Sequence, residues 1–381
     1  MSTIKVNSIK NTSTDDGGIA IDNSGHVQVD GVQLPTTGAL SNRNLIINGS
    51  MVFDQRNSGS SVTPANAEYL VDRWKVGATQ SSKFTAQQST TAPTGFKNSL
   101  LLTSSSAFSL GASDEFEIIQ FIEGNNVAHL GFGTSSAQTL TLSFYARSSL
   151  TGTFGGAIYN GAANRSYPFT YTISTADTFE LQTVTFAGDT SGTWATDNTA
   201  GINVLFSLGA GSSKLGTAGA WTGSFKPGAT GQTNLVATNG ATLYLSGVQL
   251  EVGEKATPFE HRSYGDELAK CQRYCFKYAP SNQEWIYNES NNTWGKWWHF
   301  YYPAMRDTPS FDAGTLSTGT GTSVSGLTGT ISSIAYGGSG GNGASGRQSL
   351  RITMSADSGV ARYVYHTDSW VGDHCFCFSE L

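Results

Sequence analysis

Apolar and polar residues alternate with a period of two in many short segments of this chain, and turn-forming residues separate the segments. The alternation is clearest at Leu140, Leu142, Phe144 and Ala146, and a period of two is typical of β-strands. Strands are predicted over 44–53, 73–77, 82–87, 99–103, 116–121, 139–146, 155–160, 166–172, 178–187, 202–208 and 241–252. Short strands joined by Gly, Ser, Asn and Asp turns predict a two-sheet antiparallel sandwich.

The last of these strands leads into a connector that contains Pro258. If its alternation is regular, one side carries the more apolar residues, namely Tyr244, Ser246, Val248, Leu250 and Val252. The opposite side then carries Leu243, Leu245, Gly247, Gln249 and Glu251.

A short helix is predicted after the connector, over 263–272. Ser263 suits an N-cap, and Asp266 and Glu267 follow where carboxylates meet free backbone N–H groups and the helix dipole. Beyond it, aromatic residues alternate with Arg273 and Lys277, which predicts a strand. Alternatively the helix continues, with a heptad seam that suits a trimer, made of Leu268, Cys271, Cys275 and Tyr278. One short seam is weak support for a coiled coil, so we favour the strand.

The connector separates two bodies, and the predicted fold is all-β. Residues 1–41 form an extended N-terminal arm, residues 42–262 an antiparallel jelly-roll sandwich, and residues 263–381 the helix and a second, smaller β domain. The arm holds short apolar pieces, such as 18–21 and 26–29, that cannot bury a face alone. We expect it to pair with copies of itself or to dock on another protein; the alternative is a disordered leader.

The second body is rich in aromatic residues, and a hairpin is predicted across Asn291 and Asn292, between strands near 285–287 and 295–303. The low-complexity tract over 314–346 indicates loops around one strand. Segments 349–354, 361–365 and 373–378 are predicted to complete the sheet. Aromatic faces stack on the C–H faces of pyranose rings, and amide side chains satisfy hydroxyls. The candidate carbohydrate-binding residues are therefore Trp285, Tyr287, Trp294, Trp297, Tyr301, Asn291 and Asn292. The alternative is that these rings pack in a core or between subunits.

Composition excludes several classes of partner. Charged residues make up 13% of the chain and the net charge is −6, whereas a nucleic-acid surface needs clustered Lys and Arg. No apolar run approaches the length of a membrane span, and the N-terminus has no signal-peptide core. We therefore expect that the chain is made in the cytoplasm and does not insert into a membrane.

Catalytic motifs are missing from the sequence. No H-E-x-x-H, G-x-S-x-G, P-loop or Rossmann fingerprint occurs. Paired carboxylates for glycoside cleavage remain an open alternative, drawn from Asp114, Glu115, Glu117, Glu123, Asp357, Asp368 and Asp373. We favour the interpretation that these are solvated loop acids, and we expect no enzyme activity and no cofactor.

The cysteines fall into two pairs, Cys271 with Cys275 and Cys375 with Cys377. Four thiolates could bind zinc, but neither spacing is usual for a zinc site. We therefore expect small buried apolar residues and no metal.

Two phrases carry a family resemblance. The segment 256–274, ATPFEHRSYGDELAKCQRY, with GVQLEVG before it, resembles a linker of bacteriophage tail-fibre and virion structural proteins. The segment 44–74, which begins NLIINGSMVFDQR, resembles the opening phrase of the same family, and Glu380-Leu381 matches a common ending. The order of phrases also resembles jelly-roll carbohydrate-binding modules. Some of those hold a structural calcium with an acidic residue where this chain has Ser246, so the resemblance does not extend to that metal.

The resemblance implies a phage fibre or spike that attaches to the host surface, with a surface glycan as ligand. It also implies a homotrimer, contacts of the N-terminal arm with other tail or capsid proteins, and a location on the virion after assembly in the host cytoplasm. Two alternatives are a structural virion protein without receptor contact, such as a capsid fibre or tail adaptor, and a glycan depolymerase.

Overall fold

The structure is a computed structural model that describes residues 42–278 continuously. Elsewhere it describes residues 8–10, 18–21, 27–29, 32–33, 285–290, 293–301, 306, 310–312, 329–336, 347–356, 365–366, 375–378 and 380. The chain divides into two compact units, Met1–Ser263 and Tyr264–Leu381. No helix of the described residues is long and apolar enough to cross a membrane.

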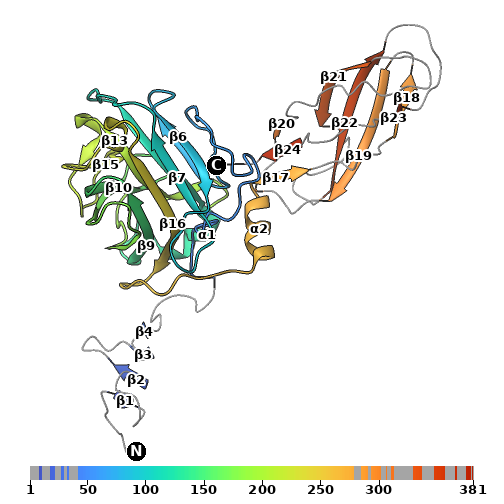
Figure 1. Ribbon diagram of the computed structural model, residues 1–381. Helices are drawn as coiled ribbons and strands as arrows, with labels where there is room; N and C mark the ends of the chain where they lie inside the picture. The colour runs from blue at the N-terminus through green and yellow to red at the C-terminus, as the bar shows by residue number, and fades with distance from the viewer. Residues whose placement is uncertain are drawn as a thin grey trace, which may run out of the picture. The chain divides into compact units, whose positions relative to one another are not determined.

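The first unit contains a sandwich of two five-stranded antiparallel sheets (Figure 1). Sheet I has the order β11-β10-β13-β8-β5, and sheet II has the order β12-β9-β16-β7-β6. The strands of sheet I are β5 (Lys75–Ala78), β8 (Glu115–Glu123), β10 (Gly152–Asn160), β11 (Ser166–Ile173) and β13 (Ala200–Ala210). Those of sheet II are β6 (Phe84–Ser89), β7 (Ser99–Ser104), β9 (Leu140–Ser148), β12 (Glu180–Phe186) and β16 (Thr242–Val252). The predicted all-β, jelly-roll type of sandwich is confirmed.

Short elements occupy the connections between these strands. They are α1 (Gly124–Val127), η1 (Ala128–Leu130), η2 (Ser212–Lys214), β14 (Leu215–Gly216), β15 (Gly228–Ala229) and η3 (Leu235–Ala237).

Side chains from both sheets form one continuous core. The Phe206 ring of sheet I lies 4.8 Å from the Phe144 ring of sheet II and 6.1 Å from the Trp74 ring, which is fully buried. Burial of one such side chain contributes about 1.5–3 kcal/mol, so the core is the main source of the sandwich's stability.

The predicted strand over 44–53 is wrong. Asn48 and Met51 both have a φ of 57°, in the left-handed region, and side chains take the place of strand partners: Ile46 N–H donates to Asn44 Oδ1, Ile47 N–H donates to Gln120 Oε1, and the Asn48 amide bonds the backbone further on. Its Nδ2 donates to the carbonyls of Phe53 and Asp72, and its Oδ1 accepts from the Phe53 N–H. Ile46 and Met51 still reach the core, so their apolar pattern reports burial and not a strand.

The expected regular alternation in β16 is also wrong. A register shift lies between Ser246 and Gln249, where Gly247 has a φ of 61°. This β-bulge changes the phase of the strand, so that Leu243 and Leu245 enter the core before it and Val248 and Leu250 after it. Gln249 therefore lies on the other side of sheet II.

The second unit begins with α2 (Tyr264–Gln272), as predicted, and continues as the strand β17 (Cys275–Tyr278). The alternative of a longer helix is wrong, because β17 pairs with β24 (Cys375–Phe378), which supplies the partners of its backbone. β24 also pairs with β20 (Ser310–Asp312), an element that the sequence pattern did not predict.

A separate sheet of this unit has the order β21-β22-β19-β18-β23. Its strands are β18 (Trp285–Ser290), β19 (Thr293–Tyr301), β21 (Gly329–Tyr336), β22 (Arg347–Ala356) and β23 (Tyr365–His366). The predicted hairpin is confirmed, since β18 and β19 pair antiparallel. The expectation that 373–378 completes the same sheet is wrong, because β24 belongs to the sheet of β17. Residues 361–364 lie outside the described residues.

The N-terminal strands pair with one another in chain order. β1 (Ser8–Lys10), β2 (Gly18–Ile21), β3 (Val27–Val29) and β4 (Val32–Gln33) form an antiparallel meander. Ile19 and Ile21 are 44% and 45% exposed. Docking of this arm on a partner stays a prediction.

Candidate functional site

The predicted sugar-binding residues fall on the hairpin of the second unit, which the structure describes by its backbone. Trp285 and Tyr287 belong to β18, and Trp294, Trp297 and Tyr301 to β19. Tyr287 pairs with Gly295, which alternates along β19 in the same phase as Trp297 and Tyr301. Trp294 pairs with Asn288 and has the opposite phase. Asn291 and Asn292 lie outside the described residues. The backbone brings these positions into neighbouring strands, and their role stays a prediction.

A second candidate, which the sequence analysis missed, lies in the first unit on the face of sheet I that points away from the core. We call this the outer face. Asn203 of β13 is opposite Phe121 of β8 on one side and Tyr159 of β10 on the other. These positions alternate with core residues such as Val204 and Ile122, which fixes the outward direction of the set.

Aromatic rings give the outer face its apolar surface. Phe121 and Phe225 pack on a small cluster of Ile119, Tyr159 and Leu205, and the Phe225 and Tyr159 rings lie 5.0 Å apart. Phe121 and Phe225 are half-exposed, so part of each ring is available to a ligand.

Lys75 contacts two aromatic rings, those of Phe121 and Tyr69. Lys75 Nζ lies 5.0 Å from the Phe121 ring centre and 5.6 Å from that of Tyr69, which is also half-exposed. Such cation–π contacts contribute about 0.5–1 kcal/mol each at exposed sites, and here they place a cation over the Phe121 ring.

Two buried polar side chains lie in the same face. Asn203 is fully buried, and within the described part of the chain neither atom of its amide has a hydrogen-bond partner. Glu117 is 3% exposed, and its Oε2 likewise has no hydrogen-bond partner among those residues. Leaving such a group without a hydrogen bond costs about 1–3 kcal/mol. Most buried polar atoms in folded proteins are paired, so these two side chains are exceptions.

Electrostatics favour the neutral form of Glu117. Burial raises its pKa well above the ordinary value, the neighbouring Glu115 raises it further, and Lys214 opposes the shift. Lys214 Nζ is held 2.7 Å from Glu115 Oε2 by an ion pair. A protonated Glu117 presents a hydroxyl donor beside a carbonyl acceptor, which suits an uncharged polar ligand.

The segment around β15 covers the part of the outer face over β10. Gln232 Nε2 donates to Ser207 Oγ at 2.8 Å, and a Cβ at Gly155 would lie 2.1 Å from Gln232 Oε1. Glycine at this position thus allows the loop to pack directly on the sheet. Phe225 packs on Tyr159 of β10, whereas Phe121 belongs to β8 and contacts Lys75 of β5.

Two of the candidate acidic residues do not lie where the sequence predicted. Glu117 and Glu123 belong to β8 and are buried, so the interpretation of them as solvated loop acids is wrong. Asp114 does lie in a turn, where its Oδ2 accepts from the Gly111 N–H at 2.7 Å. Asp357, Asp368 and Asp373 lie outside the described residues.

Metal ligands do not converge in the described part of the chain. No group of three or more His, Cys, Asp or Glu residues that could hold a metal ion occurs there. Cys271 and Cys275 are buried, and Cys275 is opposite Phe378 while Cys377 is opposite Phe276. Ser246 is fully buried and donates to the Asn98 carbonyl at 2.7 Å, which occupies its hydroxyl hydrogen.

The sequence signal for the outer face is weak but visible. In the apolar strand GINVLFSLG, residues 201–209, the polar positions Asn203 and Ser207 have the same parity and are buried. A strand buried on both faces shows no clean alternation, so polar residues of one parity were the available sign of a second buried surface.

Comparisons with known proteins give partial structural similarities. No protein-family model matches the sequence, and no curated protein matches it. The chain is similar to an enzymatically active domain of tailspike protein 4 of bacteriophage CBA120, with 12% identity and a TM-score of 0.31, over 55% of this chain and 22% of that chain. It therefore spans about a fifth of that tailspike chain.

Two carbohydrate-binding modules are also similar to the chain. The family 11 module of Clostridium thermocellum, in complex with a β-1,3-1,4-mixed-linked tetrasaccharide, has 10% identity and a TM-score of 0.27, over 53% of this chain and 98% of that one. The module TmCBM61, in complex with β-1,4-galactotriose, has 9% identity and a TM-score of 0.29, over 55% and 99%. TM-scores of this size assign no function, and the similarity to these proteins covers only part of the chain.

Proposed function

We propose that this chain is a bacteriophage virion fibre protein that attaches to the host surface by binding glycan, without catalysis. The observation that carries the glycan-binding part is the outer face of sheet I, where half-exposed rings lie beside a buried amide, that of Asn203, which has no partner among the described residues. The phage part is supported by the sequence phrases at 44–74 and 256–274.

The outer face has the groups that sugars need. A pyranose ring offers its C–H face to an aromatic ring, and its hydroxyls both donate and accept hydrogen bonds. Phe121 supplies the stacking surface once Lys75 moves aside. The amide of Asn203 can donate and accept, and the carboxyl of Glu117 adds a second polar group; because both are buried, a sugar meets them where the side chains that cover them shift or where a water bridges the gap.

Attachment through such a face is expected to be weak for one copy of the chain. Durable adhesion then depends on several copies that bind the same surface, as in the homotrimer that the family resemblance implies. The aromatic hairpin β18–β19 is a second proposed contact for host glycans, and the N-terminal arm is the proposed contact with the rest of the virion.

Glycan-array binding by the purified full chain tests this function, with Phe121→Ala as the variant of the outer face. Phe179→Ala is the matched control, because Phe179 is also half-buried and has a cation–π contact, with Arg147 at 5.9 Å, but it lies outside sheet I. We expect Phe121→Ala to weaken binding at least about tenfold, a loss of about 1.4 kcal/mol, and Phe179→Ala to leave it unchanged.

Binding that both variants retain, but that Trp297→Ala abolishes, would move the glycan site to the hairpin and contradict the role of the outer face. If the intact chain bound neither arrayed glycans nor host cells, the attachment function itself would be wrong.

A further inference from the structure

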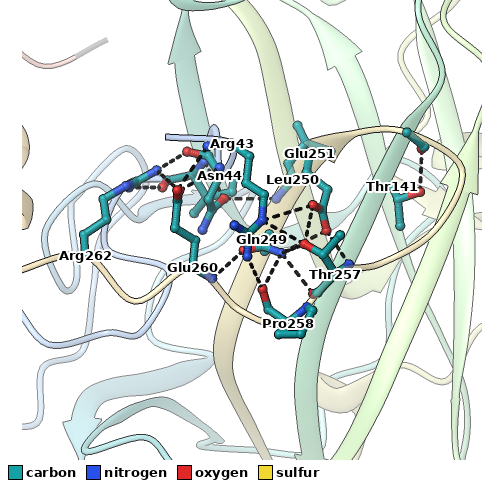
Figure 2. A network of polar contacts seen from close by, with 12 residues as sticks. Arg43, Asn44, Thr141, Gln249, Leu250, Glu251, Thr257, Pro258, Glu260 and Arg262 are labelled. Carbon is teal, nitrogen blue, oxygen red and sulfur yellow. Dashed lines mark hydrogen bonds and ion pairs between the residues drawn. The ribbon is translucent and has the colours of Figure 1, made fainter. Parts of the chain in front are cut away.

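The polypeptide enters and leaves the sandwich at the same place, and a polar network ties the two segments together (Figure 2). The incoming segment is 43–46, directly after the N-terminal arm. The outgoing segment is 257–262, directly before α2. We call the hydrogen-bonded pair of segments the terminal clamp.

Glu260 and Arg43 make the first set of bonds in the terminal clamp. The Glu260 carboxylate accepts from the backbone N–H of Asn44 at 3.0 Å and from that of Arg43 at 3.3 Å. The Arg43 guanidinium in turn donates from Nε to Thr257 Oγ1 at 2.8 Å and from Nη2 to the Pro258 carbonyl. Each partner therefore bridges the two segments.

Arg262 makes the second set. Its Nη1 donates to the Ile46 carbonyl at 3.0 Å, and its Nη2 donates to the Asn44 carbonyl. The Arg262 side chain is 9% exposed and that of Glu260 12%, so water competes poorly for these bonds.

Both segments are also fixed to the closing strand β16. The Asn44 amide accepts from the Leu250 N–H at 3.1 Å and donates to the Val248 carbonyl at 3.2 Å. Gln249 Oε1 accepts from the Glu260 N–H at 2.8 Å. The bulge at Gly247 makes this possible, because it turns Gln249 away from the core while Val248 and Leu250 enter it.

Glu251 completes the attachment on the outgoing side. Its carboxylate accepts from the Thr257 N–H at 2.8 Å and from the Thr257 hydroxyl at 2.6 Å, and it lies 3.5 Å from Arg43 Nε. Glu251 is 1% exposed, so this buried charge is stabilised by the clamp and holds the connector onto the sheet.

The contacts follow the same order along both segments. Arg43 meets Thr257 and Pro258, whereas Ile46, three residues on, meets Arg262. The segments therefore run parallel. Tension on the chain before Arg43 and after Arg262 pulls one segment toward its N-terminal end and the other toward its C-terminal end. The segments must slide past each other, so that all the cross-bonds are loaded together and not one at a time.

We propose that the terminal clamp has a load-bearing function: it carries tension between the N-terminal arm and the C-terminal unit directly, past the sandwich. The sandwich is an insertion between two segments that are already linked, so within it the load falls on β16, to which both segments are bonded, and the other strands bear little of the force. This mechanical function is independent of glycan binding, and neither proposal depends on the other.

Optical-tweezers measurements on the full chain, with handles at its two ends, test the proposal. Unfolding of the part between Arg43 and Arg262 releases about 75 nm, since about 220 residues extend by about 3.5 Å each. Arg262→Ala should shorten the lifetime of this part at constant force by at least about tenfold, which is about 1.4 kcal/mol of barrier.

Two controls separate load bearing from general destabilisation. Arg165→Ala removes another bidentate pair, Arg165 with Asp189 at 2.6 and 2.8 Å, which does not connect the two segments; it should leave the end-to-end lifetime unchanged. With handles at the exposed residues Thr94 and Ala162, the load does not pass through the clamp, and Arg262→Ala should have no effect.

If Arg262→Ala does not fold, Glu260→Gln takes its place, because it keeps the side-chain shape and removes the charge. The proposal is overturned if the clamp variant has the wild-type lifetime in the end-to-end geometry. It is equally overturned if the clamp variant shortens the lifetime as much with handles at Thr94 and Ala162.

Discussion

Replacement of Gly247 tests whether the bulge in β16 holds the sandwich together. Gly247 has a φ of 61°, and a Cβ at this position would lie 2.7 Å from Phe96 Cζ and 3.0 Å from Tyr145 Cδ2. Gly247→Ala thus introduces both a strained backbone conformation and a collision with two rings. Both effects act at the position that sets which side chains of β16 enter the core.

The expected cost is the sum of these two effects. The left-handed conformation costs an L-residue about 1–2 kcal/mol, and overpacking against neighbouring side chains costs about 1–3 kcal/mol. We therefore expect Gly247→Ala to lower the free energy of unfolding by about 2–5 kcal/mol. In a domain of this size each kcal/mol corresponds to about 2–4 °C in melting temperature.

Gly231→Ala is the matched control. Gly231 also has a positive φ, of 86°, but no atom lies within 4 Å of a Cβ there, so only the backbone cost of about 1–2 kcal/mol applies. Differential scanning calorimetry of the full chain, read at the transition of the first unit, compares the two variants. Equal melting temperatures for both would refute the claim that the bulge is packed against Phe96 and Tyr145.

Two further predictions concern the outer face. Burial raises the pKa of Glu117, so the contribution of this protonated group to stability is fully present below the unfolded-state pKa and is lost as the pH rises through the folded-state pKa. Glu117→Gln should therefore melt higher than wild type at pH 8 and equally at pH 4; a lower melting temperature at pH 8 would contradict the pKa direction. Asn203→Leu should raise the melting temperature, because it replaces a buried amide that lacks a partner among the described residues, and should abolish glycan binding. Retained binding by a folded Asn203→Leu variant would exclude that amide from the site.

The terminal clamp has its own dependence on pH. Burial would raise the pKa of Glu260, but the backbone N–H groups of Asn44 and Arg43 and the charges of Arg262 and Arg43 outweigh it and lower that pKa. The contribution of the carboxylate to stability is therefore present above the ordinary carboxyl pKa of 4.5 and is lost as the pH falls through the folded-state value.

The sandwich could be predicted from the sequence because its strands follow the rule of alternation. In β9, Leu140, Leu142, Phe144 and Ala146 are all in the core, as their spacing predicts. The rule fails where a side chain replaces backbone pairing. The Asn48 amide bonds the segment around it into a turn, and apolar spacing alone cannot distinguish that turn from a strand.

Gly247 shows a second limit of sequence reasoning. A bulge inserts one residue and reverses the phase of alternation, so the sets on either side of Gly247 must be read separately. The outer face was missed for a related reason. Phe121 and Asn203 lie on strands that are buried on both sides, and their juxtaposition depends on the register of β8 with β13, which no local pattern contains.

Glycan binding by the outer face is tested most directly by isothermal titration calorimetry. Wild type and Phe121→Ala are each titrated with a glycan that the wild type binds on the array. We expect saturable binding by wild type and at least about a tenfold weaker affinity for a Phe121→Ala variant with an unchanged circular dichroism spectrum. Equal affinities for the two folded proteins would contradict this role of the outer face.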